Sequence, residues 1–405
     1  LVQLDTASGA VRLTKVPSTP DNQAEGVLAA LGDADLAALD LIVHGTTTTT
    51  NAVLERKLAR TGLITTRGFR DVLELGRRTR PQAYGMFGRF TPVIPRDLRL
   101  EVPERVDAAG DVLTPLDEDA VRAAGRALLE AGCVSVVVHF LHAYANPAHE
   151  LRAAGILAEF WPNAHITTGH ALLSESREFE RGVTAAVNAS VQPILERYLS
   201  RLTGALAEGG YAGELLVMNG NGGMVSAARA SVEAAKTVMS GPASGVMAAA
   251  YTGRRAGFEN LITYDMGGTS TDVALIRGAE PQVSNEIEIE YAMPIHVPMV
   301  DVRTLGAGGG SIAKVNAAGL LEVGPESAGA NPGPACYRRG GPLTVTDCNV
   351  MLGKIQPENF PAVFGPNGDE PLDADVVREK FAALAKDVGG MTPEEVAEGF
   401  LRIAV

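Results

Sequence analysis

At 405 residues the chain is long enough for two or three domains. Hydrophobic residues make up 46% and charged residues 20%, which is ordinary for a globular protein. The 48 Asp and Glu residues outnumber the 35 Lys and Arg residues, and the net charge is −13. An acidic surface repels phosphate backbones and anionic lipids, so the composition argues against a nucleic-acid-binding or membrane-surface protein.

The cysteines and the hydropathy indicate a cytoplasmic protein. Cys133, Cys336 and Cys348 form no Cys-x-x-Cys pair, and a sparse, odd set argues against a disulfide framework and for a reducing compartment. No apolar run reaches the roughly 18 residues that a membrane span needs.

The first half of the chain alternates short strands with helices. A hairpin is predicted at its start, with strands at 1–4 and 11–15 around a turn. Strand–helix alternation after it implies a parallel or mixed sheet covered by helices. Later strands are predicted at 41–43, 63–65, 134–140 and near Ile166, and helices at 50–60, 118–131 and 147–160.

A long helix over 178–202 leads into the second half. We place a domain boundary near its start, which gives an N-terminal lobe at 1–180 and a second lobe at 190–405. The Gly- and Pro-rich stretch 305–341 is predicted to be a folded loop region that lines a site. Further strands are predicted at 215–218, 261–264, 273–276 and 343–346, and helices at 241–255, 374–388 and 393–405.

A Gly-Gly turn between two predicted strands carries the chemistry. Asp265-Met266-Gly267-Gly268-Thr269-Ser270-Thr271-Asp272 joins the strands at 261–264 and 273–276. The glycines let backbone N–H groups approach an anion, and the hydroxyls of Thr269, Ser270 and Thr271 add donors for phosphate oxygens. Asp265 and Asp272 are hard oxygen ligands, suited to the Mg²⁺ that accompanies ATP. A solvated Gly-Gly hairpin is the alternative.

Other nucleotide and nucleophile motifs are absent. The sequence has no Gly-x-x-x-x-Gly-Lys-Ser/Thr loop. The run Gly306–Ser311 lacks the sixth glycine and the surrounding βαβ unit of a dinucleotide-binding loop. Ser240 and Ser244 do not have the Gly-x-Ser-x-Gly spacing of a nucleophile elbow.

Several further segments are candidates to line a site. His44 and the Thr46-Thr47 pair follow the predicted strand 41–43, where α/β sheets expose ligand sites; a Thr-rich helix cap is the alternative. Gly241 lies at a predicted helix start beside Pro242, which suits either an anion or plain capping. Gly308, Gly309 and Gly310 allow close approach by a nucleotide. Asp347, after the predicted strand 343–346, is a candidate metal ligand or an ordinary turn residue.

Two further groups of ionisable residues have structural alternatives. His139, His142 and His149 lack the spacing of a tetrahedral metal site, so we predict structural histidines. The run Arg177-Glu178-Phe179-Glu180-Arg181 is either a solvated ion-pair face or part of a site.

The Asp265–Asp272 segment resembles the second phosphate loop of the actin, Hsp70 and sugar-kinase superfamily. Other segments, in the same order along essentially the whole chain, resemble the hydantoinase A, 5-oxoprolinase and acetone carboxylase family. They are His44–Asn51, Leu54–Arg56, Thr66–Glu74, Asn146–Glu150, Arg177–Arg181, Ser240–Ala243, Gly306–Ser311, Gly324–Gly329, Pro332–Tyr337 and Thr344–Asp347.

The resemblance implies an α/β fold of two actin-like, ribonuclease H-like lobes with a nucleotide cleft between them. The strand–turn–strand at 273–283 repeats the one at 1–15, and the family has a first phosphate loop before the latter. We therefore expect a fragment truncated at both ends, without that first loop and without the family's C-terminal part, and with weak or no activity alone.

The implied activity is ATP-dependent hydrolysis of a small cyclic amide, a hydantoin or 5-oxoproline, the latter in glutathione metabolism. ATP and Mg²⁺ would be the cofactors. The catalytic residues would be Asp265 and Asp272, which hold Mg²⁺ or orient the nucleophile, and His44, which with the Thr46–Thr50 loop would face the transferred phosphoryl group. A hydantoinase B-type subunit or domain would be the partner, in an oligomer. The alternatives are a ketone-phosphorylating subunit of an acetone-carboxylase-like complex and a non-catalytic ATP-gated module.

Overall fold

A computed structural model places the chain in a mixed α/β fold, as the sequence predicts. It describes residues 1–405 except 15, 17–18, 20–21, 78–83, 85–89, 269, 290–292, 330 and 405. Two compact units divide the chain: Leu1–Ala248 with Val283–Asp301, and Ala249–Gln282 with Val302–Val405. Within the described ranges, no helix combines the length and hydropathy that crossing a bilayer requires.

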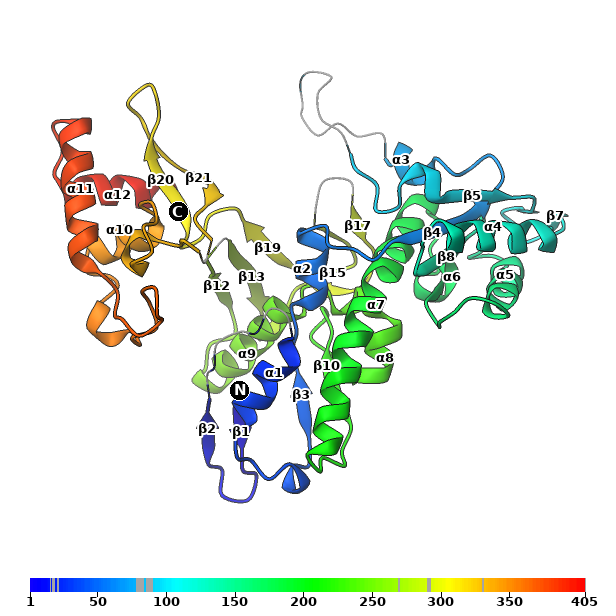
Figure 1. Cartoon of the computed structure of the whole chain (residues 1–405), viewed down its shortest axis with the longest axis horizontal. Coiled ribbons are helices and arrows are strands. Elements are labelled where there is room, and N and C mark those ends of the chain that lie inside the picture. Colours follow the sequence, from blue (N-terminus) through cyan, green and yellow to red (C-terminus); the bar gives the residue numbers. More distant parts are fainter. Residues whose placement is uncertain are drawn as a thin grey trace. The chain divides into compact units, whose positions relative to one another are not determined.

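A four-stranded parallel sheet forms one part of the first unit. Its order is β5 (Arg99–Val102), β4 (Thr61–Thr66), β8 (Ser135–His139) and β9 (Ile166–Thr168). Every residue of β4 and β8 is buried, as expected for a parallel sheet covered by helices. The helices α4 (Glu118–Glu130) and α5 (Ala148–Ala158) contact these strands (Figure 1).

A second, smaller sheet positions the His44 segment. Strand β3 (Ile42–His44) runs parallel to β10 (Leu215–Met218), which pairs antiparallel with β11 (Met224–Ser226). Helix α2 (Thr48–Leu54) begins four residues after β3 ends. The hairpin predicted at the start of the chain is present as β1 (Val2–Leu4) and β2 (Val11–Leu13).

Helix α7 (Glu178–Glu208) is the longest element of the first unit (Figure 1). It contacts the parallel sheet through β4, β8 and β9, and it also contacts α2, which follows β3 of the smaller sheet. All residues from 179 to 193 are buried, because packing surrounds this half of the helix on every side. Residues 180–190, where the sequence suggested a domain boundary, are an uninterrupted part of this helix, inside the first unit.

The second unit contains the Gly-Gly turn. Strands β12 (Leu261–Met266) and β13 (Thr271–Arg277) form an antiparallel pair, and β13 also pairs with β14 (Glu280–Pro281) and β19 (Val302–Leu305). The remaining strands, β20 (Ser311–Val315) and β21 (Leu321–Ser327), form a hairpin within the stretch predicted to be a folded loop.

Three helices complete the second unit: α10 (Val345–Met351), α11 (Ala374–Val388) and α12 (Pro393–Ala404). Their apolar faces enclose a core that includes Cys336, Phe381 and Phe400. Residues 343–346 were predicted to be a strand. That prediction is wrong, because Thr344 caps α10 and Val345 begins it.

The other elements are short or peripheral. Helix α9 (Ser240–Ala256) follows the short 3-10 helix η3 (Ala234–Thr237) and belongs to the first unit up to Ala248. The rest are α1 (Gln23–Leu31), α3 (Val72–Leu75), α6 (Gly169–Leu172), α8 (Ala227–Val232), β6 (Arg105–Val106), β7 (Val112–Thr114), β15 (Val283–Ser284), β16 (Ile287–Glu288), β17 (Pro294–Ile295) and β18 (Met299–Val300).

Candidate functional site

The sequence-predicted site residues fall into two groups, one in each unit. In the second unit, the register of β12 and β13 places Asp265 directly opposite Asp272. Directly opposed residues of an antiparallel pair project from the same face, so the two carboxylates are neighbours. The turn is closed by a hydrogen bond from Gly267 N to Ser270 O of 2.8 Å. Thr269 lies outside the described residues.

The predicted loop Gly308–Gly310 lies against this turn. Gly309 N donates to Gly267 O at 2.9 Å, and Gly310 N donates to Gly268 O at 2.5 Å. A Cβ on Gly310 would lie 2.7 Å from Gly268 O, and one on Gly309 would lie 2.7 Å from Thr346 Oγ1. Glycine is therefore required for two backbones to approach this closely.

The turn keeps one amide open toward solvent. Gly268 is exposed, a Cβ there would meet nothing within 4 Å, and its N–H has no acceptor in the described ranges. Such an amide suits an anion. By contrast, the buried Thr271 hydroxyl donates to Ala307 O at 2.6 Å. This hydrogen bond ties the turn to the neighbouring loop, so the hydroxyl proton of Thr271 is not available to a phosphate.

The two carboxylates fit a Mg²⁺ ion that also binds phosphate. Asp265 is exposed and Asp272 is half-buried, with Asp272 Oδ1 accepting a 2.7 Å hydrogen bond from Thr304 Oγ1. No group of three or more His, Cys, Asp and Glu residues in the described part of the chain could hold a metal ion. Mg²⁺ does not need such a group, because it usually keeps several waters and takes one or two carboxylates plus phosphate oxygens.

Asp347 has a structural role instead. Its carboxylate is fully buried and accepts hydrogen bonds from Ala335 N, Cys336 N, Thr344 N and Thr344 Oγ1 at 2.8–3.0 Å. Together with Thr344 it forms a capping box at the start of α10. Four donors of the protein thus surround this buried carboxylate, which favours a structural role for Asp347 over metal binding.

The first unit gathers the second group of predicted residues around the end of β3. Ser240 Oγ, at the start of α9, donates to Thr46 O at 2.9 Å, and a Cβ on Gly241 would lie 3.2 Å from Thr47 Cγ2. Met239, just before this helix, has a φ of 58°. A bulky residue in that conformation costs roughly 1–3 kcal/mol, and such strain is concentrated at functional sites.

An open pocket of about 970 Å³ lies beside these residues, within the first unit. Its polar lining includes His44, Thr46, Thr47 and Thr48 from the predicted segment. Thr47 is exposed, and its hydroxyl accepts a bond from Asn51 Nδ2 at 3.3 Å, so its own proton remains available to a ligand. The other polar residues of the lining are Thr14, Thr19, Gln23, Asn51, Glu55, Lys57 and Tyr198.

Tyr198 is the residue of this pocket that sequence reasoning missed. It comes from α7, 154 positions from His44, and its hydroxyl lies 2.6 Å from His44 Nε2. Burial lowers the pKa of His44 to about 4. Burial also raises the pKa of Tyr198 to about 12, opposed by the Thr46 hydroxyl. Both rings are therefore neutral near pH 7. No local pattern marks Tyr198, since only the fold brings α7 to β3.

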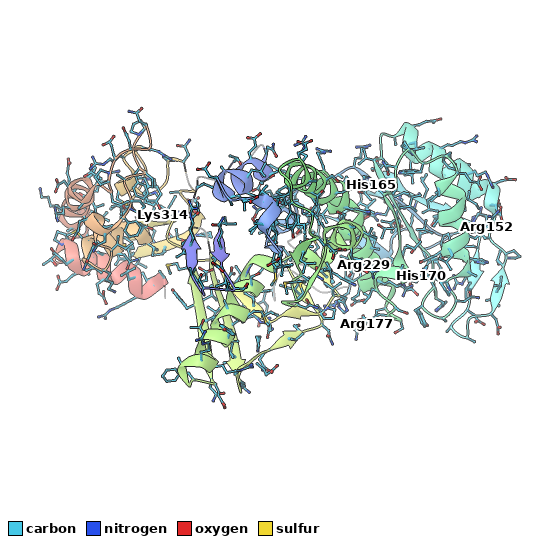
Figure 2. The ribbon with its side chains drawn as sticks, turned by 90° about the horizontal axis from the view of Figure 1, so that it is seen from below. Arg152, His165, His170, Arg177, Arg229 and Lys314 are labelled. Atoms are coloured by element: carbon cyan, nitrogen blue, oxygen red, sulfur yellow. The ribbon has the colours of Figure 1, made fainter. Side chains whose placement is uncertain are left out.

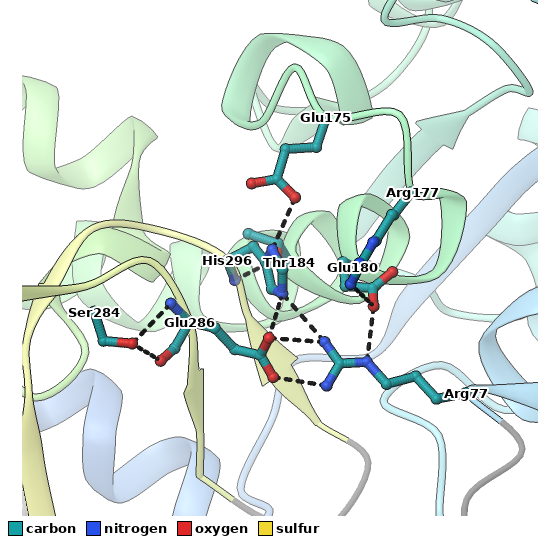
Figure 3. Close-up of polar contacts among 8 residues, drawn as sticks. All are labelled: Arg77, Glu175, Arg177, Glu180, Thr184, Ser284, Glu286 and His296. Carbon is teal, nitrogen blue, oxygen red and sulfur yellow. Dashed lines mark hydrogen bonds and ion pairs between the residues drawn. The ribbon is translucent and has the colours of Figure 1, made fainter.

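The Arg177–Arg181 segment divides between two ion-pair networks at the start of α7. Glu180 accepts from Arg77 Nε at 2.7 Å, and Arg77 also makes a bidentate pair with Glu286 at 2.7 and 2.8 Å (Figure 3). His296 joins this network through Glu286 at 2.9 Å and Glu175 at 2.8 Å (Figure 3).

The second network faces the parallel sheet, where Arg181 contacts Glu178 and donates to Phe140 O at 3.1 Å. The segment is thus mainly an ion-pair region, in which Glu180 and Arg181 are buried and Arg177 is exposed.

Several histidines near the parallel sheet pair with carboxylates. His149 contacts Glu104 at 2.8 Å and His170 contacts Glu150 at 2.6 Å; His170 and His165 flank β9 (Figure 2). His139 is 3% exposed, and neither ring nitrogen has a hydrogen-bond partner in the described ranges. Burial, with the nearby Arg181 charge, lowers its pKa to about 4.

The cysteines are buried, reduced residues. Cys133, Cys336 and Cys348 are all free and buried. Burial raises the pKa of the Cys336 thiol and raises that of Cys348 to about 12. Thiols with raised pKa values are poor nucleophiles, so Cys336 and Cys348 are poorly suited to nucleophilic catalysis.

Comparison with known proteins matches this chain to two family descriptions. Residues 181–405 match "Hydantoinase/oxoprolinase", and residues 1–161 match "Hydantoinase/oxoprolinase N-terminal region". The 5-oxoprolinase 1 of Arabidopsis thaliana is 37% identical over 89% of this chain and 30% of its own length. The acetophenone carboxylase gamma subunit of Aromatoleum aromaticum is 36% identical over 93% of this chain and 55% of its own.

Two solved structures share the fold. The ATP-dependent caprolactamase from Pseudomonas jessenii has a TM-score of 0.81 and 33% identity, and a nucleotide-free acetone carboxylase has a TM-score of 0.80 and 30% identity. Each covers 99% of this chain, which spans 59% of either solved chain. The first family description covers more than half of the chain, and the motifs quoted above lie in order along it. The chain therefore belongs to the hydantoinase/oxoprolinase family.

Proposed function

We propose that the full-length protein is an ATP-dependent enzyme that hydrolyses a small cyclic amide of the hydantoin or 5-oxoproline type. The observation that carries this proposal is the pair of opposed carboxylates, Asp265 and Asp272, flanking a glycine turn with an open amide. Membership of the family supports it, as does the likeness to a 5-oxoprolinase and to an ATP-dependent caprolactamase.

A lactam carbonyl is a poor electrophile, so hydrolysis needs activation. In the proposed reaction the carbonyl oxygen forms a bond to the γ-phosphorus of ATP while the bond to ADP breaks. Water then attacks the activated carbon, and the ring C–N bond breaks with protonation of nitrogen, which leaves an acyl phosphate. A second water hydrolyses this acyl phosphate to a carboxylate and inorganic phosphate. In such phosphoryl transfers the protein contributes mainly position and charge neutralisation.

The turn in the second unit would supply both contributions. The Gly268 N–H and the Ser270 hydroxyl would donate to phosphate oxygens, and the Gly308–Gly310 backbone would hold the turn in shape. Asp265 and Asp272 would hold Mg²⁺, directly or through water. When bound, Mg²⁺ would neutralise charge on the phosphates and orient them.

The first unit would contribute a separate donor group. Thr47, with its available hydroxyl proton, and Gly241, at the start of α9, would face an anionic or carbonyl oxygen in the pocket beside His44. We also propose a B-type partner subunit or domain and an oligomer, since one relative is itself a gamma subunit. The three free cysteines favour a cytoplasmic location.

A second candidate function is phosphorylation of a ketone enolate before carboxylation. The likeness to an acetophenone carboxylase subunit and to an acetone carboxylase favours it specifically. Both functions use the same ATP site and differ in the phosphoryl acceptor.

Phosphate release by the full-length protein with its partner separates the candidates. The proposal predicts release that depends on hydantoin, 5-oxoproline or another lactam. Release that depends on a ketone and bicarbonate would favour the second function. Release that ignores every small substrate and responds only to a protein partner would contradict both and favour an ATP-gated module.

A further inference from the structure

The His44–Tyr198 contact assigns the proton on the histidine ring. The two groups meet at 2.6 Å through Tyr198 Oη and His44 Nε2, and their rings are tilted by 53° with centroids 5.6 Å apart. The rings therefore meet at their polar edges and do not stack. Both partners belong to regular elements, because His44 ends β3 in register with Val217 of β10 and Tyr198 lies in α7. This fixes the geometry of the contact.

The direction of this hydrogen bond follows from the acidity of its two groups. A neutral phenol is a stronger donor than a neutral imidazole N–H, and an imidazole nitrogen is a stronger acceptor than a phenol oxygen. Tyr198 O–H therefore donates to His44 Nε2, which needs the lone pair on that nitrogen. A neutral imidazole carries only one proton, so it must be on Nδ1.

His44 Nδ1 has no hydrogen-bond partner among the residues that the structure describes, and the ring lines the 970 Å³ pocket. We infer that Tyr198 fixes His44 as the neutral Nδ1–H tautomer, so that this pocket recognises its ligand through an acceptor oxygen, carbonyl or phosphoryl. A neutral donor orients such an oxygen without transferring a proton to it. Only the identity of the ligand rests on the proposed function; the tautomer does not.

Ring-¹⁵N-histidine NMR of the full-length protein near pH 7.5 tests the tautomer directly, with the His44 signals assigned by their loss in His44→Asn. We expect a protonated Nδ1 and an unprotonated Nε2. Tyr198→Phe removes the donor and should abolish this pattern. Tyr144→Phe is the matched control, since Tyr144 OH contacts a different histidine, His142 Nδ1, at 3.3 Å. It should leave the His44 signals unchanged.

Three NMR results would overturn the assignment. A proton on Nε2 alone or on both nitrogens in the unaltered protein would refute the tautomer. An Nδ1–H pattern that survives Tyr198→Phe would refute the role of Tyr198. The absence of any shift at Nδ1 during separate titrations with ADP, inorganic phosphate and 5-oxoproline would refute the ligand contact. A shift with only one class of these compounds identifies the oxygen as phosphoryl or carbonyl.

Amide substitutions give an independent test. The side-chain nitrogen of Asn can occupy the place of Nδ1, whereas that of Gln can occupy the place of Nε2. For the compound that shifts Nδ1, His44→Gln should weaken binding by about three- to tenfold, the effect of losing one neutral hydrogen bond, and His44→Asn should retain most of the affinity. The reverse order would contradict the inference. The tautomer measurement does not depend on the substrate, so it remains valid if the enzyme proves to act on another compound.

Discussion

Replacing Gly310 with Ala tests whether the two glycine loops of the second unit touch. Gly310 N donates to Gly268 O, and an added Cβ would lie 2.7 Å from that same oxygen and 3.0 Å from Ser327 Oγ. Carbon and backbone oxygen do not approach this closely in real structures. The turn or the loop must therefore move by several tenths of an ångström, and the hydrogen bond between them must weaken.

The expected cost can be separated into two parts. Forcing one methyl group into a filled space costs about 1–3 kcal/mol. Replacing Gly by Ala also reduces the freedom of the unfolded chain, which stabilises by about 0.4–1 kcal/mol. Gly310→Ala should therefore destabilise the second unit by about 1–2 kcal/mol.

Gly306→Ala is the matched control in the same loop. A Cβ there meets nothing within 4 Å, and Gly306 does not have a positive φ. This variant should be more stable by about 0.4–1 kcal/mol, because Ala reduces the conformational freedom of the unfolded chain.

Hydrogen exchange read by mass spectrometry provides the assay, because it reports opening free energies locally in a chain of several units. Peptides covering 261–277 and 306–315 should exchange faster in Gly310→Ala and no faster in Gly306→Ala than in the unaltered protein. Equal protection in both variants would refute the close approach of the two loops.

Three further changes test other parts of the structure. Asp347→Asn should lower the free energy of unfolding in urea by about 1–3 kcal/mol, because buried donors lose an acceptor. The variant should keep its Mg²⁺-dependent affinity for ATP. Loss of that affinity at unchanged stability would show that Asp347 binds the metal. The pKa of His139, about 4 when folded and about 6.5 when unfolded, makes the unfolded chain bind more protons, so melting temperature should fall between pH 6.5 and 4. His139→Phe should reduce that fall, and an identical pH profile would contradict it. Arg77→Met leaves the buried Glu180 carboxylate without its guanidinium and should destabilise by about 1–3 kcal/mol, less than for a fully buried pair because Arg77 is 33% exposed; a neutral effect in urea unfolding would contradict the network.

Much of the fold could be predicted because it is encoded locally. Strand β10 and helix α11 have the predicted bounds, since each is an uninterrupted periodic run between clear breakers. The start of α10 was mistaken for a strand because Leu343–Thr346 is rich in β-branched residues. The sequence does contain a signal for the helix start, because Thr344 and Asp347 have the three-residue spacing of a capping box.

Some features of the candidate site could also be predicted from the sequence, and others depend on tertiary packing. The opposed aspartates follow from sequence because a short turn between two strands fixes their register. The contact between the Gly308–Gly310 loop and that turn depends on tertiary packing across roughly forty residues of chain, and the Tyr198–His44 contact depends on where α7 lies. Asp347 and Thr271 look like ligands in sequence, but their partners in the fold use their hydrogen bonds.

The central claim is that Asp265, Asp272 and the glycine turn form the Mg²⁺ and phosphate site. Isothermal titration of ATP into the full-length protein, with and without Mg²⁺, tests it on Asp265→Asn and Asp272→Asn, which keep the shape of each side chain. We expect Mg²⁺ to strengthen ATP binding to the unaltered protein and each variant to lose about tenfold or more of that gain, roughly 1.4 kcal/mol of charge-assisted ligation. If both variants kept the ATP affinity and the Mg²⁺ dependence of the unaltered protein, Asp265 and Asp272 would not form the Mg²⁺ site.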